Sequence, residues 1–371
     1  MKTKAAVSYE PGKPLVIEEL ELDEPQAGEV LVKMAAVGLC HSDYHVMAGD
    51  RPVGMRPMVL GHEGAGVVEA AGPGVTRIQP GDHVVLMFIP SCGKCHFCVS
   101  GMTHACVLSA NIARGPQLDG AFRLHNRQGQ DVGQFCLLGA FSEYAVVNQD
   151  SVCVIDERYP LEVACLVGCG VVGGFCAAVN RAGVRPGSSV LVIGAGGVGM
   201  NVIQGARASS ASTIIAADVV DRKLAWAKSF GATHTINANK TDVVSKVMEI
   251  TDGAGVDFAF EAISSPETIS QAYAATAKLG TVVVIGLTPA TADSLPISPL
   301  SLVLSQKTLM GTLYGTSNAQ VEIPKLLSMY GHGQLKLDEL VTNTYTLDEI
   351  NQGYADMLAG KNVRGVVTFA R

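Results

Sequence analysis

VLVIGAGGVGMNVIQGARA, residues 190–208, joins an apolar, strand-like run to a helical pattern through a glycine-rich turn. Gly194, Gly196 and Gly199 stand in G-x-G-x-x-G register, with Gly197 between them. Such glycines permit a tight turn, let the backbone approach a pyrophosphate and allow close helix–strand packing, while the helix N-terminus attracts negative charge. The stretch therefore predicts a dinucleotide-binding loop.

The next strand-like run ends in an acidic residue that refines this prediction. Asp218 lies 19 residues after Gly199, where a carboxylate can accept hydrogen bonds from the adenosine ribose hydroxyls and repel a 2′-phosphate. This favours NAD over NADP as the coenzyme. Lys223, five residues later, is a second candidate for the same ribose; the alternative is a solvated helix charge.

Strand-like and helical patterns alternate around the glycine turn. Apolar runs at 189–194, 213–218, 256–262 and 281–287 are separated by amphipathic, helical stretches such as 221–232 and 265–280. This alternation is typical of βαβ units on a parallel sheet. Residues 1–170 instead contain short β-like stretches broken by Gly and Pro, which predict a largely antiparallel domain. The last fifty or so residues look helical with a closing strand. The predicted fold class is α/β.

Composition narrows the class of protein. The chain has 371 residues, 48% hydrophobic and 16% charged, with 41 glycines and a net charge of −7, which suits a compact enzyme of two domains. The sequence has no basic stripe, so we do not expect a nucleic-acid partner. The start lacks the apolar core of a signal peptide, and no apolar run reaches about 18 residues, so we expect a cytoplasmic protein without a membrane partner.

Four of the ten cysteines form a dense cluster in CGKCHFCVSGMTHAC, residues 92–106. The spacing C-x2-C-x2-C-x7-C lets four thiolates surround one tetrahedral ion, and four protein ligands leave no position for water or substrate. A closed site of this kind is structural. The sequence therefore predicts a structural zinc on Cys92, Cys95, Cys98 and Cys106. In a reducing compartment, cysteines are metal ligands or core residues more often than disulfides.

An open metal site needs three ligands and a vacancy. Cys40 in GLCHSDYH, His62 in GHEGAG and Cys169 in GCGVVGG are candidates. Each alone is a weak signal, because a buried Cys is usually a small apolar residue and a lone His is usually a hydrogen-bonded core residue. Together they would form the Cys2His set of a catalytic zinc site with one exchangeable water.

These motifs, in this order and approximate spacing, resemble the zinc-dependent, medium-chain alcohol dehydrogenases. The likeness runs from KAAV near the start to VRGVVTF near the end. It implies a Rossmann domain at 171–313 that binds NAD, and a GroES-like catalytic domain formed by 1–170 and 314–371. It also implies two zinc ions per chain, an alcohol or aldehyde as the small-molecule partner, and a homodimer or homotetramer.

The resemblance also implies roles for single residues. Cys40, His62 and Cys169 would hold the catalytic zinc, with Glu63 as an alternative carboxylate ligand and Asp43 orienting His62, as expected behind a metal-bound imidazole. A zinc ion of this kind lowers the pKa of an alcohol, so that hydride can pass to the nicotinamide. In the family, the proton leaves through a serine, the ribose hydroxyls and a histidine, here Ser42 and His45.

Other matching positions suggest contacts with coenzyme and substrate. His41 and Arg364 match contacts to the coenzyme pyrophosphate, and Phe88 matches a wall of the substrate cleft. Each has a plainer alternative: surface charges for His41, His45 and Arg364, a turn hydroxyl for Ser42 and core packing for Phe88. The remaining cysteines have no partner spacing and are expected in the core: Cys136, Cys153, Cys165 and Cys176.

Two departures from the family bear on function. Ala110 stands where the glutathione-dependent formaldehyde dehydrogenases carry an arginine, and Val172-Gly173-Gly174 replaces a Ser-Thr-Gly segment beside the nicotinamide. The sequence is most similar to bacterial nicotinoprotein alcohol dehydrogenases, which retain NAD(H). The expected activity is reversible hydride transfer between primary alcohols or aldehydes and NAD. The alternatives are a thiol-linked (glutathione or mycothiol) formaldehyde dehydrogenase and, outside enzymes, a zinc-binding interaction module on an inactive fold.

Overall fold

The computed structural model describes residues 1–288, 292 and 294–370, which include every candidate site residue. The chain divides into two compact units. One unit combines Met1–Cys169 with Asn318–Arg371, and the other consists of Gly170–Ser317. Each candidate zinc site lies in the first unit, and the glycine turn lies in the second.

The second unit is built on a parallel sheet of six strands in the order β13-β12-β11-β14-β15-β16. The chain-order numbers of these strands within the unit read 3-2-1-4-5-6, which is the order of doubly wound dinucleotide-binding sheets. Their bounds are β11 Ser189–Ile193, β12 Thr213–Asp218, β13 His234–Asn237, β14 Val256–Glu261, β15 Thr276–Val284 and β16 Thr308–Gly311. Strands β12 and β13 are added on one side of β11, and β14, β15 and β16 on the other. The strand order therefore reverses at β11, directly before the glycine turn.

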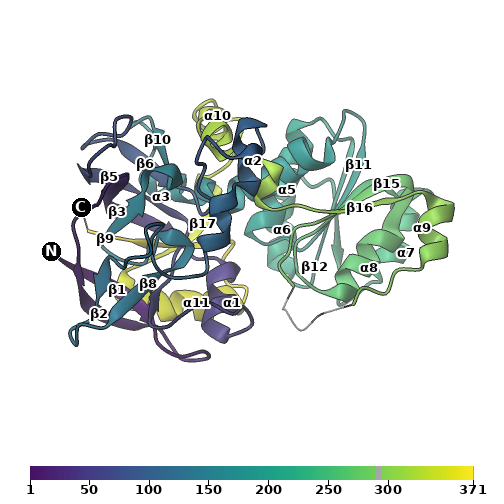
Figure 1. Ribbon diagram of the computed structural model, residues 1–371. Coiled ribbons are helices and arrows are strands. Elements are labelled where there is room, and N and C mark those ends of the chain that lie inside the picture. Colours follow the sequence, from purple (N-terminus) through teal and green to yellow (C-terminus); the bar gives the residue numbers. More distant parts are fainter. Residues whose placement is uncertain (289–291, 293, 371) are drawn as a thin grey trace. The chain divides into compact units, whose positions relative to one another are not determined.

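Helices cover both faces of this sheet, with α5 and α6 on one side and α7, α8 and α9 on the other (Figure 1). Apolar side chains of the strands pack with those of α7 and α8 in one buried cluster that includes Leu191, Ile215, Val247 and Ala272. The bounds are α4 Gly170–Cys176, α5 Gly197–Ala208, α6 Asp221–Phe230, α7 Val243–Ile250, α8 Pro266–Ala275 and α9 Pro299–Ser305. The α/β fold class predicted from the alternation is confirmed.

The helix predicted over 265–280 is too long by five residues. Helix α8 ends at Ala275, and Thr276 already begins β15. The pairing of β15 with β14 is irregular between Val256 and Phe258, and Leu279 has a positive φ of 64°. An irregular strand start of this kind carries no period-two pattern, which is why the sequence favoured a continued helix.

The first unit contains a closed barrel and a seven-stranded sheet. The barrel order is β1-β2-β7-β8-β4, with bounds Lys2–Ser8, Val16–Leu22, Leu124–His125, Asp131–Gln134 and Met58–Val59. The sheet order is β10-β6-β5-β3-β18-β17, with β9 also paired to β3. Its bounds are β3 Glu29–Gly38, β5 Gly64–Ala71, β6 His83–Leu86, β9 Tyr144–Asn148, β10 Val152–Ile155, β17 Val341–Tyr345 and β18 Arg364–Thr368.

Short helices and the C-terminal segment complete the first unit. They are α1 His41–Ala48, α2 His96–Val99, α3 Leu161–Ala164, α10 Ala319–Gly331 and α11 Ile350–Leu358. The predicted closing strand is β18, and a second strand that the sequence did not predict, β17, lies parallel to it. The residues of β17, VTNTY, are only partly buried and alternate weakly, so their strand character was hidden in a helical context.

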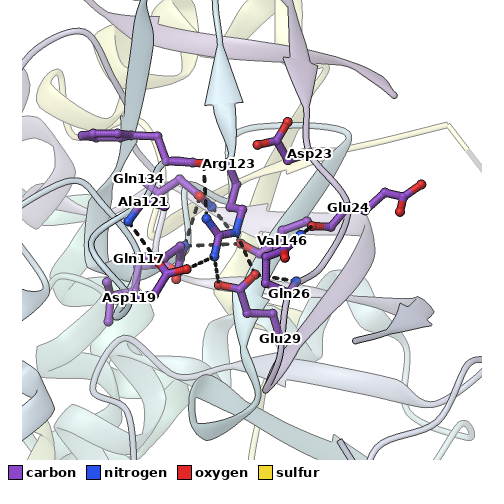
Figure 2. A network of polar contacts seen from close by, with 12 residues as sticks. Asp23, Glu24, Gln26, Glu29, Gln117, Asp119, Ala121, Arg123, Gln134 and Val146 are labelled. Carbon is purple, nitrogen blue, oxygen red and sulfur yellow. Dashed lines mark hydrogen bonds and ion pairs between the residues drawn. The ribbon is translucent and has the colours of Figure 1, made fainter. Parts of the chain in front are cut away.

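A buried ion pair ties the start of β3 to the 117–134 segment (Figure 2). Arg123 makes two contacts with Glu29, from Nε to Oε2 at 2.8 Å and from Nη2 to Oε1 at 2.9 Å. Asp119 accepts a further bond from Nη2 at 2.5 Å. Removing one partner of such a pair leaves an uncompensated buried charge, so substitution of Arg123 or Glu29 alone is expected to destabilise this unit.

Within the described residues, no single helix combines the length and hydropathy of a membrane span; only the bent pair Leu161–Gly168 and Gly170–Ala182 passes such a test jointly. All ten cysteines are free thiols. Four of them, outside the metal clusters, are buried as predicted: Cys136, Cys153, Cys165 and Cys176.

Candidate active site

The four cysteines of residues 92–106 converge on one point. Their sulfur atoms all lie within 4.8 Å of one another, with Cys92 Sγ 3.9 Å from Cys98 Sγ and Cys95 Sγ 4.0 Å from Cys106 Sγ. Backbone N–H groups of Cys95 and Cys98 point to the sulfurs of Cys92 and Cys95, at 3.4 and 3.5 Å. Four sulfurs at this spacing are a set that a tetrahedral zinc ion can fill completely.

The thiols of this cluster differ in acidity because their surroundings differ. Backbone N–H groups, of Val107 and Cys98, lower the pKa of Cys95 to about 6. Burial raises the pKa of Cys106 to about 12. Both must be thiolates to bind a metal, so metal binding at this cluster releases protons and weakens as the pH falls.

A second cluster is assembled from three distant segments. Side-chain ligand atoms of Cys40, His62, Glu63 and Cys169 lie within 4.8 Å of one another. Cys40 precedes the first turn of α1 with extended backbone, His62 and Glu63 lie between β4 and β5, and Cys169 follows the turn Cys165–Gly168. The fold thus brings together the three residues predicted as an open site, with the predicted carboxylate beside them.

Asp43 holds the histidine of this cluster in place. Its Oδ2 lies 2.9 Å from His62 Nδ1, and its Oδ1 accepts a hydrogen bond from the backbone N–H of Gly61 at 2.9 Å. Gly61 has a positive φ of 91°, and a Cβ there would meet the backbone nitrogen of Phe141 at 2.6 Å. Because Nδ1 faces Asp43, the other ring nitrogen of His62 is the one available to a metal.

Glu63 is already paired with a residue outside the cluster. Arg364, at the start of β18, forms a buried ion pair with Glu63 Oε2. A Cβ at Gly38 would lie 2.4 Å from Glu63 Oε2, so the missing side chain makes room for this pair. Sequence reasoning missed this role of Gly38 and the Glu63–Arg364 pair, since nothing local in the sequence connects the three positions.

Burial and mutual hydrogen bonding shift the acidities in this cluster. The Cys169 thiol donates to Cys40, which lowers the pKa of Cys40 and raises that of Cys169. Burial lowers the pKa of His62, but the charges of Asp43 and Cys40 outweigh it and raise the pKa well above its usual value. Burial also raises the pKa of Glu63 to about 7 against the opposing charge of Arg364.

These features fit a divalent cation. The donors are two sulfurs, one imidazole and one carboxylate; Cys40, His62 and Glu63 are buried and Cys169 is half-buried. Sulfur with imidazole is the ligand set that zinc prefers. Glu63 Oε1 is buried and, among the described residues, has no hydrogen-bond partner. A cation would compensate the charge that these groups otherwise hold through protons.

Aromatic rings flank His62. The Phe88 ring lies edge-on at 5.6 Å and the Phe135 ring edge-on at 6.0 Å, measured between ring centroids. Phe88 is only half-buried, whereas Phe135 is fully buried. Sequence reasoning named Phe88 and missed Phe135, whose place beside His62 depends on a turn with positive φ values at the next two residues, 57° and 62°.

The relay candidates share helix α1. Ser42 and His45 stand three residues apart, a spacing that makes side chains neighbours on a helix. Both are half-buried, and His45 Nδ1 lies 3.2 Å from Asp50 Oδ2. His41 is exposed in the first turn of the same helix. Ser42 and His45 therefore lie on one side of the same helix, both partly exposed.

The glycine turn has the shape predicted for a dinucleotide loop. Gly194 follows β11 with a φ of 98°, and a Cβ at Gly199 would lie 1.8 Å from the Gly194 carbonyl oxygen. A Cβ at Gly196, which precedes the first turn of α5, would meet nothing within 4 Å. Internal packing therefore explains Gly194 and Gly199 but not Gly196, where the open space suits the approach of a phosphate.

Asp218 ends β12 and is buried against this turn. Its Oδ2 accepts from the backbone N–H of Ala195 at 2.9 Å, and its Oδ1 accepts from the N–H of Val220 at 2.9 Å. The carboxylate thus shapes the loop itself, a role that sequence reasoning did not assign. Lys223 lies half-buried on α6.

Comparison with known proteins gives the family. An alcohol dehydrogenase GroES-like domain model matches residues 26–157, and a zinc-binding dehydrogenase model matches residues 197–330. The NDMA-dependent alcohol dehydrogenase of Amycolatopsis methanolica is 47% identical over 99% of this chain and 99% of its own. This chain belongs to the zinc-dependent alcohol dehydrogenase family.

Two further relatives match nearly the whole chain. The crystal structure of benzyl alcohol dehydrogenase from Acinetobacter calcoaceticus superposes with a TM-score of 0.94 at 36% identity, covering 100% of both chains. The S-(hydroxymethyl)glutathione dehydrogenase of Saccharomyces cerevisiae is 40% identical over 99% of this chain and 96% of its own.

These likenesses confirm four predictions: the α/β fold of a Rossmann and a GroES-like part, the family, an enzymatic alcohol dehydrogenase, and zinc with a nicotinamide dinucleotide as the kinds of cofactor. Enzymatic function is thereby favoured over the alternative of an inactive zinc module.

Proposed function

We propose that this enzyme oxidises primary alcohols, and reduces the corresponding aldehydes, at the cluster of Cys40, His62 and Cys169, with NAD as the hydride carrier. The observation that carries the proposal is the set of donor atoms within 4.8 Å of one another, whose carboxylate is paired with Arg364. Three ligands remain for zinc, which leaves a position for substrate. When bound there, zinc supplies Lewis acidity to the substrate oxygen.

The residues around the cluster perform the remaining tasks in this proposal. Asp43 orients His62, and Arg364 restrains Glu63, the alternative ligand. Ser42 accepts the alcohol proton and gives up its own hydroxyl proton, which reaches solvent through His45. Phe88 lines the substrate end beside His62 and excludes water from the reacting carbon.

Coenzyme binding belongs to residues 171–313 in this proposal. The turn of Gly194, Gly196, Gly197 and Gly199 receives the pyrophosphate at the N-terminus of α5, and Asp218 selects NAD through the ribose hydroxyls. Lys223 is a further ribose contact, and His41 and Arg364 are phosphate contacts. Residues 1–170 and 314–371 form the catalytic domain, which also holds a structural zinc on Cys92, Cys95, Cys98 and Cys106.

We further propose that NAD(H) stays bound between turnovers, in a cytoplasmic homodimer or homotetramer. Support for retention comes from the 47% identical relative of Amycolatopsis methanolica, which is named an NDMA-dependent alcohol dehydrogenase. Ten free thiols suit a reducing compartment.

Alcohol oxidation and coenzyme retention are tested separately. A panel of alcohols and aldehydes is assayed with added NAD, with NDMA, and with neither. Turnover of primary alcohols supports the activity, and no turnover in any arm refutes it. Denaturing the purified protein should release stoichiometric NAD(H) into the supernatant; an empty supernatant refutes retention but leaves the alcohol dehydrogenase proposal intact.

A thiol-linked formaldehyde dehydrogenase is the second candidate, because a relative of that activity is 40% identical. Ala110, where the glutathione-dependent relatives are expected to carry an arginine, speaks against it. Oxidation of formaldehyde that strictly requires glutathione or mycothiol, without turnover of simple alcohols, would favour this candidate.

A further inference from the structure

Arg51 is a cation beside the candidate metal cluster that the proposed mechanism does not use. It follows α1, which ends at Ala48 and is capped by Gly49 with a φ of 92°, and its backbone N–H donates to His45 O at 3.1 Å. The side chain is half-buried, and the guanidinium carbon lies 5.6 Å from the centroid of the Phe135 ring. This distance is within the range of a cation–π contact.

Phe135 connects Arg51 to the cluster. The ring is fully buried and lies 6.0 Å from the His62 ring, edge-on at 85°. The following turn keeps it in place, with Cys136 N–H donating to Ile112 O at 2.6 Å. The same aromatic ring is therefore near both the guanidinium and a candidate metal ligand.

The guanidinium of Arg51 has no internal carboxylate partner in the described part of the chain. The nearby acidic groups are already engaged, Asp50 with His45 and Asp43 with His62 and Gly61. Other buried arginines of this unit are paired, as Arg123 is with Glu29 and Arg364 with Glu63. A half-buried cation with five N–H donors and no counter-ion is suited to an anionic ligand.

We propose that Arg51 is a specificity-determining residue that binds a carboxylate at the far end of the alcohol substrate. The inference rests on the proposed function and narrows it to alcohols that carry a carboxylate group. Phe135 presents one face to the guanidinium, so the planar group is held in place and its N–H edge remains for a bidentate contact. Position 110, where the glutathione-dependent enzymes carry an arginine, is Ala110 in this chain. In this proposal Arg51, just after α1, supplies a carboxylate-binding cation instead.

The test compares two aryl alcohols of similar size. 4-(Hydroxymethyl)benzoate carries the carboxylate, and 4-methylbenzyl alcohol replaces it with a methyl group. We expect the holoenzyme to oxidise both and to prefer the carboxylate in kcat/KM. In Arg51→Gln, the preference should fall by about 10- to 100-fold, the loss expected for a hydrogen bond to a charged group, with the neutral alcohol little affected. Arg51→Lys should retain part of the preference, because the charge remains.

Arg158→Gln is the matched control. Its guanidinium carbon lies 5.4 Å from the Tyr159 ring in the same unit, but it is exposed and paired with Asp156. We expect no change in the substrate preference. A second measurement needs no variant: benzoate should inhibit the wild-type enzyme more strongly than benzamide, and added salt should weaken the difference.

The outcomes separate the two proposals. An unchanged preference in Arg51→Gln, or equal inhibition by benzoate and benzamide, would overturn the role of Arg51. Efficient oxidation of the neutral alcohol without any preference for the carboxylate would do the same while supporting alcohol dehydrogenase activity. If the wild-type enzyme oxidises neither these alcohols nor any of the panel, the proposed function fails, and the inference fails with it.

Discussion

The cluster at Cys92–Cys106 and the cluster around Cys40 both place their donor atoms within 4.8 Å of one another, yet the two differ in how they are built. The first takes all four donors from fifteen consecutive residues, and two of its cysteines are half-buried. The second takes its donors from three distant segments, and its carboxylate is already paired with Arg364. Four cysteine sulfurs can fill all four positions of a tetrahedral zinc ion. Where the fourth donor is a carboxylate already paired with an arginine, one coordination position stays open.

This difference predicts separable consequences. Loss of metal from the local cluster should reduce the stability of the protein and loosen its loop, with little effect on the chemistry at the other cluster. The cluster around Cys40 is held together by the fold, so the protein should stay folded without this metal ion but lose alcohol oxidation. Four substitutions, ordered by expected effect, test the contrast.

The largest effect is expected from Cys169→Ala. Alcohol oxidation should fall by about 10³-fold or more, because a missing ligand removes the Lewis acid from the reacting oxygen. Zinc measured by atomic spectroscopy should drop from two to one per chain, while the circular dichroism spectrum is retained. Cys165→Ala is the matched control, since Cys165 is also buried but lies outside the cluster, and it should keep both ions. Two zinc ions in Cys169→Ala would contradict the assignment.

Cys106→Ala should instead reduce stability. We expect the loss of the other zinc ion and a fall of about 4 kcal/mol or more in the free energy of unfolding, as for other lost metal sites. Limited proteolysis should then cut within residues 92–106. The remaining zinc should support turnover in the folded fraction. Complete loss of both ions would show that the clusters are not independent.

Asp43→Asn should weaken the second cluster without abolishing it. The substitution removes the carboxylate 2.9 Å from His62 Nδ1, and partners of this kind typically contribute about 10- to 100-fold to metal affinity. Competition with a chelator, followed over time, should show faster loss of one zinc ion only. Equal loss from both clusters would argue against a specific contact with His62.

The smallest effect is expected for His45→Gln. If His45 passes the proton to solvent, the rate of alcohol oxidation near neutral pH should fall by about 10-fold, and a diffusible buffer base should restore part of it. Both zinc ions should remain. Asp50→Asn is a useful companion, because it removes the carboxylate 3.2 Å from His45 Nδ1 and should produce a smaller change of the same kind. A rate that is unaffected in His45→Gln would remove the residue from the relay.

Much of the fold could be predicted because strands and helices of the second unit carry strong periodic patterns. The runs at 189–193 and 213–218 are almost wholly buried, and such runs are recognisable from composition alone. The errors fell on 276–280 and on β17, where pairing partners distant in sequence decide the backbone conformation. Short or irregular strands of this kind have little local signal.

The sequence by itself determined the four-cysteine cluster and the glycine turn. In each case the residues lie close together in one short segment, so covalent spacing limits where their groups can point. Only the tertiary structure brought Cys40, His62, Glu63 and Cys169 within 4.8 Å. It also paired Glu63 with Arg364 and placed Arg51 over the Phe135 ring. These contacts join residues far apart in the chain, so no local pattern encodes them; packing of the barrel and sheet decides them.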